Sequence, residues 1–164
     1  MSKIKILLAI PLVIFCLLLP ACSKTQEKTS VSEKVQINKS DPWTKDDIIM
    51  PKTLTAELKS DKEKPMLIQV GFKMLYNQSH IPGSVFTGPA SINKGIDVLK
   101  DTLKNVSRDK NIVLYCGCCE WKECPNIRPA FKIVKEMGFK NAKILYLKNT
   151  FVIDWVKKGY PAAK

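Results

Sequence analysis

The chain has 164 residues and a formal net charge of +12. Lysine supplies nearly all of the positive charge, with 25 lysines against two arginines, and the lysines are spread along the chain rather than clustered. A surface that binds nucleic acid would favour arginine and aromatic side chains. We therefore expect a solvated cationic surface and no nucleic-acid partner.

The N-terminus has the pattern of an export signal. Lys3 and Lys5 form a short positive region, and an apolar stretch of 14 residues follows at positions 6–19. A membrane-spanning helix needs about 20 apolar residues, whereas a secretory signal peptide needs fewer. The pattern therefore predicts a signal peptide rather than a transmembrane anchor.

The end of this segment resembles the bacterial lipobox, in the residues Leu19-Pro20-Ala21-Cys22. The resemblance implies a signal peptide at residues 1–21 and a lipid on Cys22, which would hold the protein on a membrane. Ser23 follows the lipidation site, a choice that goes with the outer membrane in Gram-negative bacteria. We expect a lipid-anchored protein of the cell envelope, on the outer membrane facing the periplasm if the cell is Gram-negative.

The mature chain divides into a tether and one domain. Residues 22–42 are mostly polar and predict a flexible tether. Residues 43–164 are enough for one domain with one core. No internal repeat is present.

Short apolar runs alternate with amphipathic stretches through this domain. The runs predict strands at 66–70, 85–86, 112–116 and 144–147, and the stretches predict helices at 52–59, 93–104, 127–137 and 150–158, with a short helical link at 72–79. Strands that alternate with helices indicate an α/β fold with a mostly parallel sheet. Asn126 is expected to cap the helix at 127–137, and Gly138 to end it.

A cluster of cysteines follows the predicted strand at 112–116. Cys116 stands where this strand ends, and Cys118, Cys119 and Cys124 follow within nine residues. Ligands of open α/β sheets bind at the carboxyl ends of the strands, where backbone N–H groups and a helix N-terminus can hold a thiolate. Cys116 is therefore the predicted catalytic residue.

The order of several motifs resembles the rhodanese-like domain family. In that family a strand carrying Asp-Val-Arg is followed by His-Ile-Pro-Gly-Ala, and a later strand ends in the nucleophilic cysteine. The matching residues here are Gln69, His80-Ile81-Pro82-Gly83-Ser84, Cys116, Met137-Gly138-Phe139, Trp155 and Gly159-Tyr160-Pro161. The resemblance covers roughly residues 43–161.

The resemblance implies one rhodanese-like domain with a five-stranded, mostly parallel sheet and helices on both faces. It implies a structural turn at His80 rather than a catalytic base. The chain departs from the family pattern at Gln69 and Gly71, which replace Asp and Arg, and at Asn149-Thr150, where Gly-Gly is common. Its loop after Cys116 is also about five residues longer than the compact family loop, in which backbone amides surround the sulfur.

The resemblance favours sulfur transfer, with a persulfide on Cys116 that is formed from a small sulfur donor and passed to a thiol acceptor. Lys122 and Arg128 are candidates to bind an anionic donor. Trp121 either packs in the core or covers the site. The active-site loop would comprise Gly117, Cys118, Cys119, Glu120, Trp121 and Lys122.

Three alternatives stay open for the cysteine cluster. Thiol–disulfide exchange would use Cys118, Cys119 or Cys124 as a resolving cysteine, and Cys124 is expected to pair with Cys118 or Cys119 under oxidising conditions. Four thiols could also bind a soft metal, although one short loop would have to surround the ion, so we expect no metal and no cofactor. A domain that binds a partner without catalysis is the third. A Cys-x5-Arg phosphatase is disfavoured, because the sixth residue after Cys116 is Lys122.

Overall fold

The computed structural model describes residues 35–164. The predicted signal peptide, the predicted lipidation site and most of the predicted tether lie outside the described residues. Within the described part of the chain, no helix is long and apolar enough to cross a membrane.

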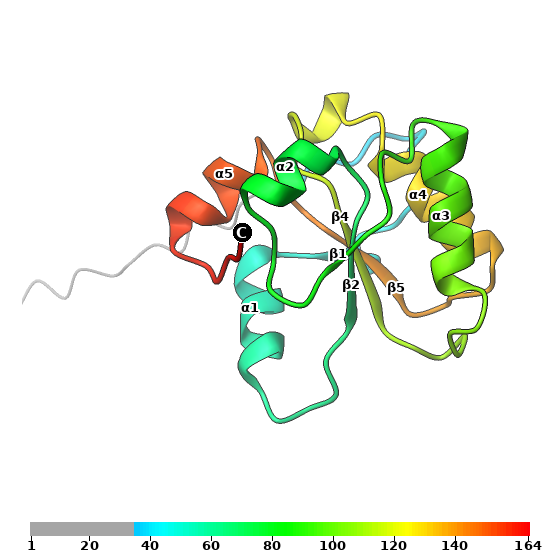
Figure 1. The fold of residues 1–164 in the computed structure, drawn as a ribbon, viewed down its shortest axis with the longest axis horizontal. Helices are drawn as coiled ribbons and strands as arrows, with labels where there is room; N and C mark the ends of the chain where they lie inside the picture. The colour runs from blue at the N-terminus through cyan, green and yellow to red at the C-terminus, as the bar shows by residue number, and fades with distance from the viewer. Residues whose placement is uncertain (1–34) are drawn as a thin grey trace, which may run out of the picture. The chain divides into compact units, whose positions relative to one another are not determined.

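A five-stranded, fully parallel sheet forms the centre of the domain (Figure 1). Its strands lie in the order β1-β5-β4-β2-β3. The parallel sheet that the sequence predicts is confirmed, and β4 lies in the middle of it. The strand bounds are β1 Ile48–Ile49, β2 Met66–Gln69, β3 Val85–Phe86, β4 Ile112–Tyr115 and β5 Ala142–Leu145.

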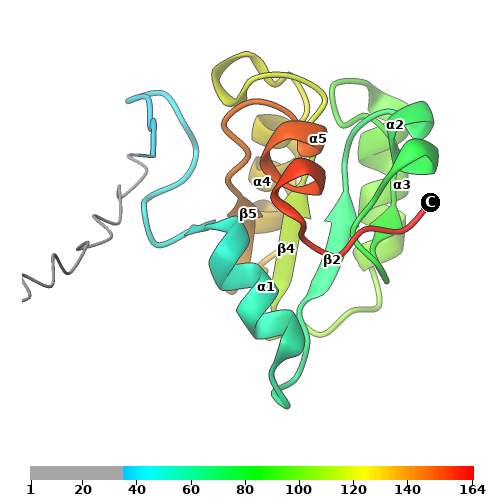
Figure 2. The same ribbon diagram turned by 90° about the vertical axis from the view of Figure 1, so that its left-hand side faces the viewer.

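Five helices cover the two faces of the sheet. They are α1 Pro51–Lys59, α2 Lys73–Gln78, α3 Asn93–Leu103, α4 Ile127–Glu136 and α5 Phe151–Asp154. The α3 and α4 helices share one buried apolar cluster with alternate residues of β4, and α1 and α5 share the other cluster with the intervening residues (Figure 2). Because side chains alternate along a strand, Leu114 faces α3 and α4 while Tyr115 faces α5. Cys116 continues the first series, towards α4.

Three elements differ from the sequence prediction. The strand predicted at 144–147 lies two residues earlier, as β5 at Ala142–Leu145. The strand β1 was not predicted, because it has only two residues and no alternating pattern can be recognised over that length. The predicted helix at 150–158 is α5 followed by a separate 3-10 turn at Val156–Lys158. The interruption lies at Trp155, whose backbone is not helical and whose indole is fully buried.

The end of the predicted tether lies against the domain. We call residues 35–43 the N-terminal strap. Val35 and Ile37 pack against the buried cluster on the α4 side. The side chain of Asp41 is fully buried, and Arg128 Nε of α4 donates to it at 2.8 Å. Contacts with the domain therefore begin earlier than the predicted boundary at residue 43.

We predict that Asp41→Asn lowers the free energy of unfolding by about 1–3 kcal/mol, because it weakens a charge-assisted hydrogen bond to a buried carboxylate. Asp101→Asn is the matched control, since the Asp101 side chain is 72% exposed in its pair with Lys104. We expect the control to cost less than about 0.5 kcal/mol. Urea unfolding of both variants measures the difference, and equal costs would show that the strap contributes little.

Candidate functional site

Cys116 lies directly after the carboxyl end of β4 and is 4% exposed. Gly71, after the neighbouring β2, lies beside its sulfur, and a Cβ atom at that position would be 3.0 Å from Cys116 Sγ. Any side chain at this position would therefore crowd the Cys116 sulfur, and the glycine avoids that contact. The predicted position of Cys116 at a strand end is confirmed.

The chain turns sharply at Gly117 to leave the sheet. Its φ is +71°, in the left-handed region that favours glycine. The Gly117 carbonyl accepts a hydrogen bond from Phe151 N at 3.0 Å, which ties the loop to the start of α5. A Cβ atom at Gly117 would lie 2.6 Å from Phe151 Cβ, so this position has no room for a side chain.

Trp121 anchors the far side of the loop. It opens the 3-10 turn Trp121–Glu123, and its ring packs against Trp43 at 5.1 Å and Tyr146 at 4.9 Å between centroids. Its Nε1 donates to Gln36 O of the N-terminal strap at 2.8 Å. With 4% of its surface exposed, Trp121 is part of the core and does not act as a movable cover.

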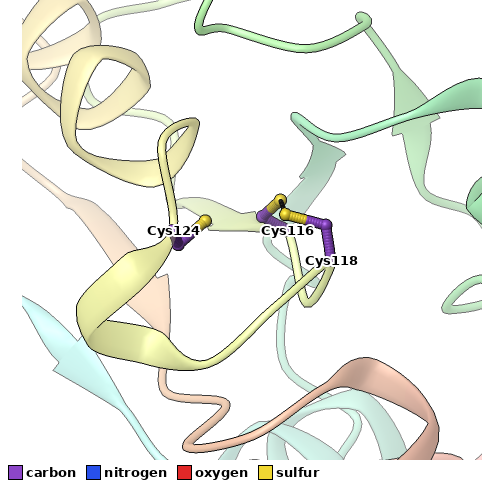
Figure 3. A group of neighbouring side chains, drawn as sticks. All are labelled: Cys116, Cys118 and Cys124. Carbon is purple, nitrogen blue, oxygen red and sulfur yellow. Dashed lines mark hydrogen bonds between the residues drawn. The ribbon is translucent and has the colours of Figure 1, made fainter.

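The 3-10 turn brings Cys124 back beside the start of the loop. The Sγ atoms of Cys116, Cys118 and Cys124 all lie within 4.8 Å of one another, and Figure 3 shows these three side chains converging. Cys116 Sγ and Cys118 Sγ share a hydrogen bond at 3.3 Å, and Cys118 Sγ lies 3.2 Å from Cys119 Sγ. All four are free thiols. Their predicted pairing under oxidation stays a prediction.

Asn126 holds the sulfurs from the α4 side. Its side chain makes no capping bond to α4, so the capping role predicted for it is wrong. Instead, its Nδ2 donates to Cys116 Sγ at 3.5 Å and lies 3.7 Å from Cys118 Sγ. Its Oδ1 accepts from Ser91 N at 3.0 Å, which fixes the orientation of the buried amide. The sequence gives no signal for this role, because an asparagine before a helix usually indicates a cap.

The surroundings of Cys124 favour its anionic form. The thiols of Cys116 and Cys118 and the backbone N–H groups of Asn126 and Ile127 lower the pKa of Cys124 to about 3, against the opposing effect of burial. The hydrogen bond with Cys118 lowers the pKa of Cys116, but its bond to Cys124, burial and the charge on Cys124 raise it to about 12. The neighbouring thiols, and to a smaller extent the start of α4, thus favour the thiolate form of Cys124. The thiolate that the sequence predicts at Cys116 stays a prediction.

The two cations predicted to bind a donor lie in different surroundings. Arg128 is held by Asp41, lies over the Trp43 ring at 5.4 Å and donates to Cys124 O at 3.3 Å. These contacts give it a structural role between strap and loop. Lys122 is 58% exposed and lies 3.9 Å from the Glu120 carboxylate, also a predicted loop residue.

His80 takes part in a structural turn, as the sequence predicts. Its ring stacks on Tyr76 at 4.1 Å, and its Nδ1 lies 2.9 Å from Tyr76 O. Its backbone exchanges hydrogen bonds with Ala163. The nearby hydroxyl of Tyr115 bonds Ser84 Oγ at 2.7 Å, which ties this turn to β4.

Two very small cavities touch Cys116. One, of about 10 Å³, lies between Cys116, Trp121 and Cys124. The other, of about 20 Å³, lies between α2 and α5, where Gln69, Leu75 and Phe151 are among its lining residues. Each has room for about one water molecule or one sulfur atom. The site in this conformation therefore accepts an added sulfur atom more readily than a large substrate.

We predict that Gly117→Ala lowers the free energy of unfolding by about 2–4 kcal/mol, because the new methyl group overlaps Phe151. The matched control is Gly83→Ala, at a φ of +77° with no atom near the added Cβ. It carries the same backbone strain without the overlap, and we expect a cost of about 1–2 kcal/mol. Thermal or urea unfolding compares the two variants, and equal costs would contradict the tight contact.

Known proteins share this architecture. The sequence model of the Rhodanese-like domain matches residues 50–149. No curated protein is similar enough in sequence to count as a relative. Solved structures show the same fold at low identity. A rhodanese-like domain from Anabaena sp. is 17% identical, covers 71% of this chain and 78% of its own, and has a TM-score of 0.53.

Two further structures agree with this comparison. A protein from Bacillus halodurans is 24% identical over 70% of this chain and 74% of its own, with a TM-score of 0.54. A single-domain sulfurtransferase from Saccharomyces cerevisiae is 16% identical over 75% of this chain and 95% of its own, with a TM-score of 0.53. The family match spans more than half of the sequence, and the five-stranded parallel sheet places Cys116 where the motif order requires it. The chain belongs to the rhodanese-like domain family.

Proposed function

We propose that this protein is a sulfurtransferase that carries sulfane sulfur as a persulfide on Cys116 and passes it to a thiol acceptor. The observation that carries the proposal is the position of Cys116, directly after the end of the central strand and in the lining of a small cavity between α2 and α5. An outer sulfur atom fits in that space. Membership of the rhodanese-like family supports the same chemistry.

The reaction needs a nucleophilic sulfur and two displacement steps. Cys116 attacks the sulfane sulfur of a small donor, and the donor's sulfur–leaving group bond breaks with its electron pair on the leaving group. The proton that Cys116 loses in this step ends on the leaving group. An acceptor thiolate then attacks the outer sulfur and regenerates Cys116.

The groups around the two sulfurs can stabilise the charged intermediates. Asn126 Nδ2 is 3.5 Å from Cys116 Sγ, and the backbone N–H of Cys118 also favours the anionic form of Cys116. A buried amide that is already oriented stabilises charge without reorganising when the charge forms. Lys122 remains the cation that we propose to attract an anionic donor, because its ammonium group is exposed at the edge of the loop.

Thiol–disulfide exchange is a second candidate. It is favoured by the 3.3 Å separation of the Cys116 and Cys118 sulfurs, which places a second thiol next to the first. A Cys116 persulfide attacked by a neighbouring thiolate would release hydrosulfide and leave a disulfide. The mass of the intact protein after reaction with donor separates the two, since a persulfide adds one sulfur atom and a disulfide removes two hydrogens.

We predict that Cys116→Ser lowers sulfur transfer by about 10³-fold or more, because the attacking sulfur is removed. The domain should remain folded, since serine is nearly isosteric. Cys119→Ser is the control, because its sulfur lies outside the group formed by Cys116, Cys118 and Cys124. Persulfide labelling with mass spectrometry gives the readout. Labelling that survives in Cys116→Ser and disappears in Cys124→Ser would assign the carrier to Cys124 instead.

We also propose that the protein is exported and anchored in the cell envelope by a lipid on Cys22. The support is the lipobox-like sequence after a short apolar segment. Export would place the cysteine cluster in an oxidising compartment, where disulfides form and persist.

For this anchor we predict that Cys22→Ala moves the protein from the membrane fraction to the soluble fraction, or leaves it unprocessed, because the lipid cannot be attached. Cys16→Ala is the matched control, since this cysteine lies within the apolar segment upstream of the cleavage site. Fractionation and immunoblotting measure the distribution. Normal cleavage with full membrane retention in Cys22→Ala would contradict lipidation.

A further inference from the structure

We propose that Cys116, Cys118 and Cys124 form a three-thiolate site for a soft monovalent metal ion, Cu(I), and that the bound ion blocks sulfur transfer. The inference goes beyond the proposed function and uses the same sulfurs in a second way. It also departs from our expectation from sequence that no metal binds.

The sulfur positions fit three-coordinate binding. All three Sγ atoms lie within 4.8 Å of one another before any ion is present. Metal–sulfur bonds of about 2.3 Å in a trigonal plane would separate the sulfurs by about 4 Å. Small rotations of the three side chains therefore suffice. The sequence argument against a metal was that one short loop must surround the ion, and the turn at Trp121–Glu123 does this by returning Cys124 to the start of the loop.

The donor set selects a soft ion. Within residues 35–164, this trio is the one group of three histidine, cysteine or carboxylate side chains whose ligand atoms lie this close together. The single histidine, His80, stacks on Tyr76 instead. A site made of thiolates alone favours Cu(I), Zn(II) or an iron–sulfur cluster over harder ions.

The number of ligands distinguishes among these soft ions. Cys119 Sγ is 3.2 Å from Cys118 Sγ but does not belong to the close trio. Structural zinc sites and most iron–sulfur clusters use four protein ligands. Three converging sulfurs therefore favour a monovalent ion that accepts trigonal coordination.

The residues that contact the three cysteines also suit bound thiolates. Asn126 Nδ2 points at the sulfurs of Cys116 and Cys118, and the buried amide is fixed by the bond from Ser91 N to Oδ1. Donors of this kind orient metal ligands and moderate their charge. The loop is held from the other side by Trp121, so the three sulfurs remain near one another. Cys118 is half-buried and offers the ion a path from solvent.

The experiment is an anaerobic titration of the reduced full chain in detergent with Cu(I), in the presence of a chromophoric Cu(I) chelator. We expect the protein to withdraw one equivalent of copper from the chelator. Cys118→Ser should weaken binding by at least about 100-fold, because one of three ligands is lost. Cys119→Ser is the matched control and should change the affinity by less than about threefold. Thermal unfolding confirms that both variants are folded.

Two further measurements test how the copper ion is coordinated and whether it blocks activity. X-ray absorption of the copper-loaded protein should show three sulfur neighbours, and loading should abolish persulfide formation on Cys116. The proposal is overturned if no copper leaves the chelator, if Cys119→Ser weakens binding as much as Cys118→Ser, or if Zn(II) binds more tightly with four sulfurs. Persulfide formation without copper binding would defeat this inference alone. Copper binding without persulfide formation on metal-free protein would defeat the proposed function alone.

Discussion

The burial of Trp121 is the interaction on which the site depends. The loop between β4 and α4 covers residues 116–126, and an unanchored loop of this length would spread its thiols over many positions. Packing of the indole between Trp43 and Tyr146, with its N–H bonded to Gln36, fixes the middle of the loop. Cys124 follows three residues later, and the 3-10 turn at Trp121–Glu123 brings it back towards Cys116. Core packing, rather than any contact between sulfurs, therefore brings the thiols together.

Once the loop is closed, the neighbouring thiols and the start of α4 both lower the pKa of Cys124. Cys124 lies at the N-terminus of this helix, where backbone N–H groups lack partners within the helix. Asn126 faces the other two sulfurs with its amide N–H instead. The Cys116 sulfur contacts the Cys118 thiol and the Asn126 side-chain amide. Thiols can lose their own protons or bind metal, so this loop has chemistry that amides lack.

The sheet could be predicted from the sequence because β4 is a continuous apolar run and β2 is apolar except for Gln69, and their parallel order follows from the alternating helices. The strap could not, because Val35 and Ile37 are two apolar residues in a polar segment that composition alone describes as a tether. Cys116 was placed correctly by its position after a strand. The role of Asn126 escaped prediction, because the orientation of an amide depends on tertiary neighbours such as Ser91.

In the sequence, the strap lies between the predicted lipidation site at Cys22 and the sheet that carries Cys116. It contains the end of the predicted tether, bonds Trp121 through Gln36 and holds Arg128 through Asp41. Both contacts end on residues that flank Cys124, so displacement of the strap would loosen the loop before it affected the sheet. The geometry of the thiols therefore depends on a segment that family resemblance places outside the catalytic fold. A domain cut at residue 43 would keep the rhodanese-like sheet and lose part of what orders its active-site loop.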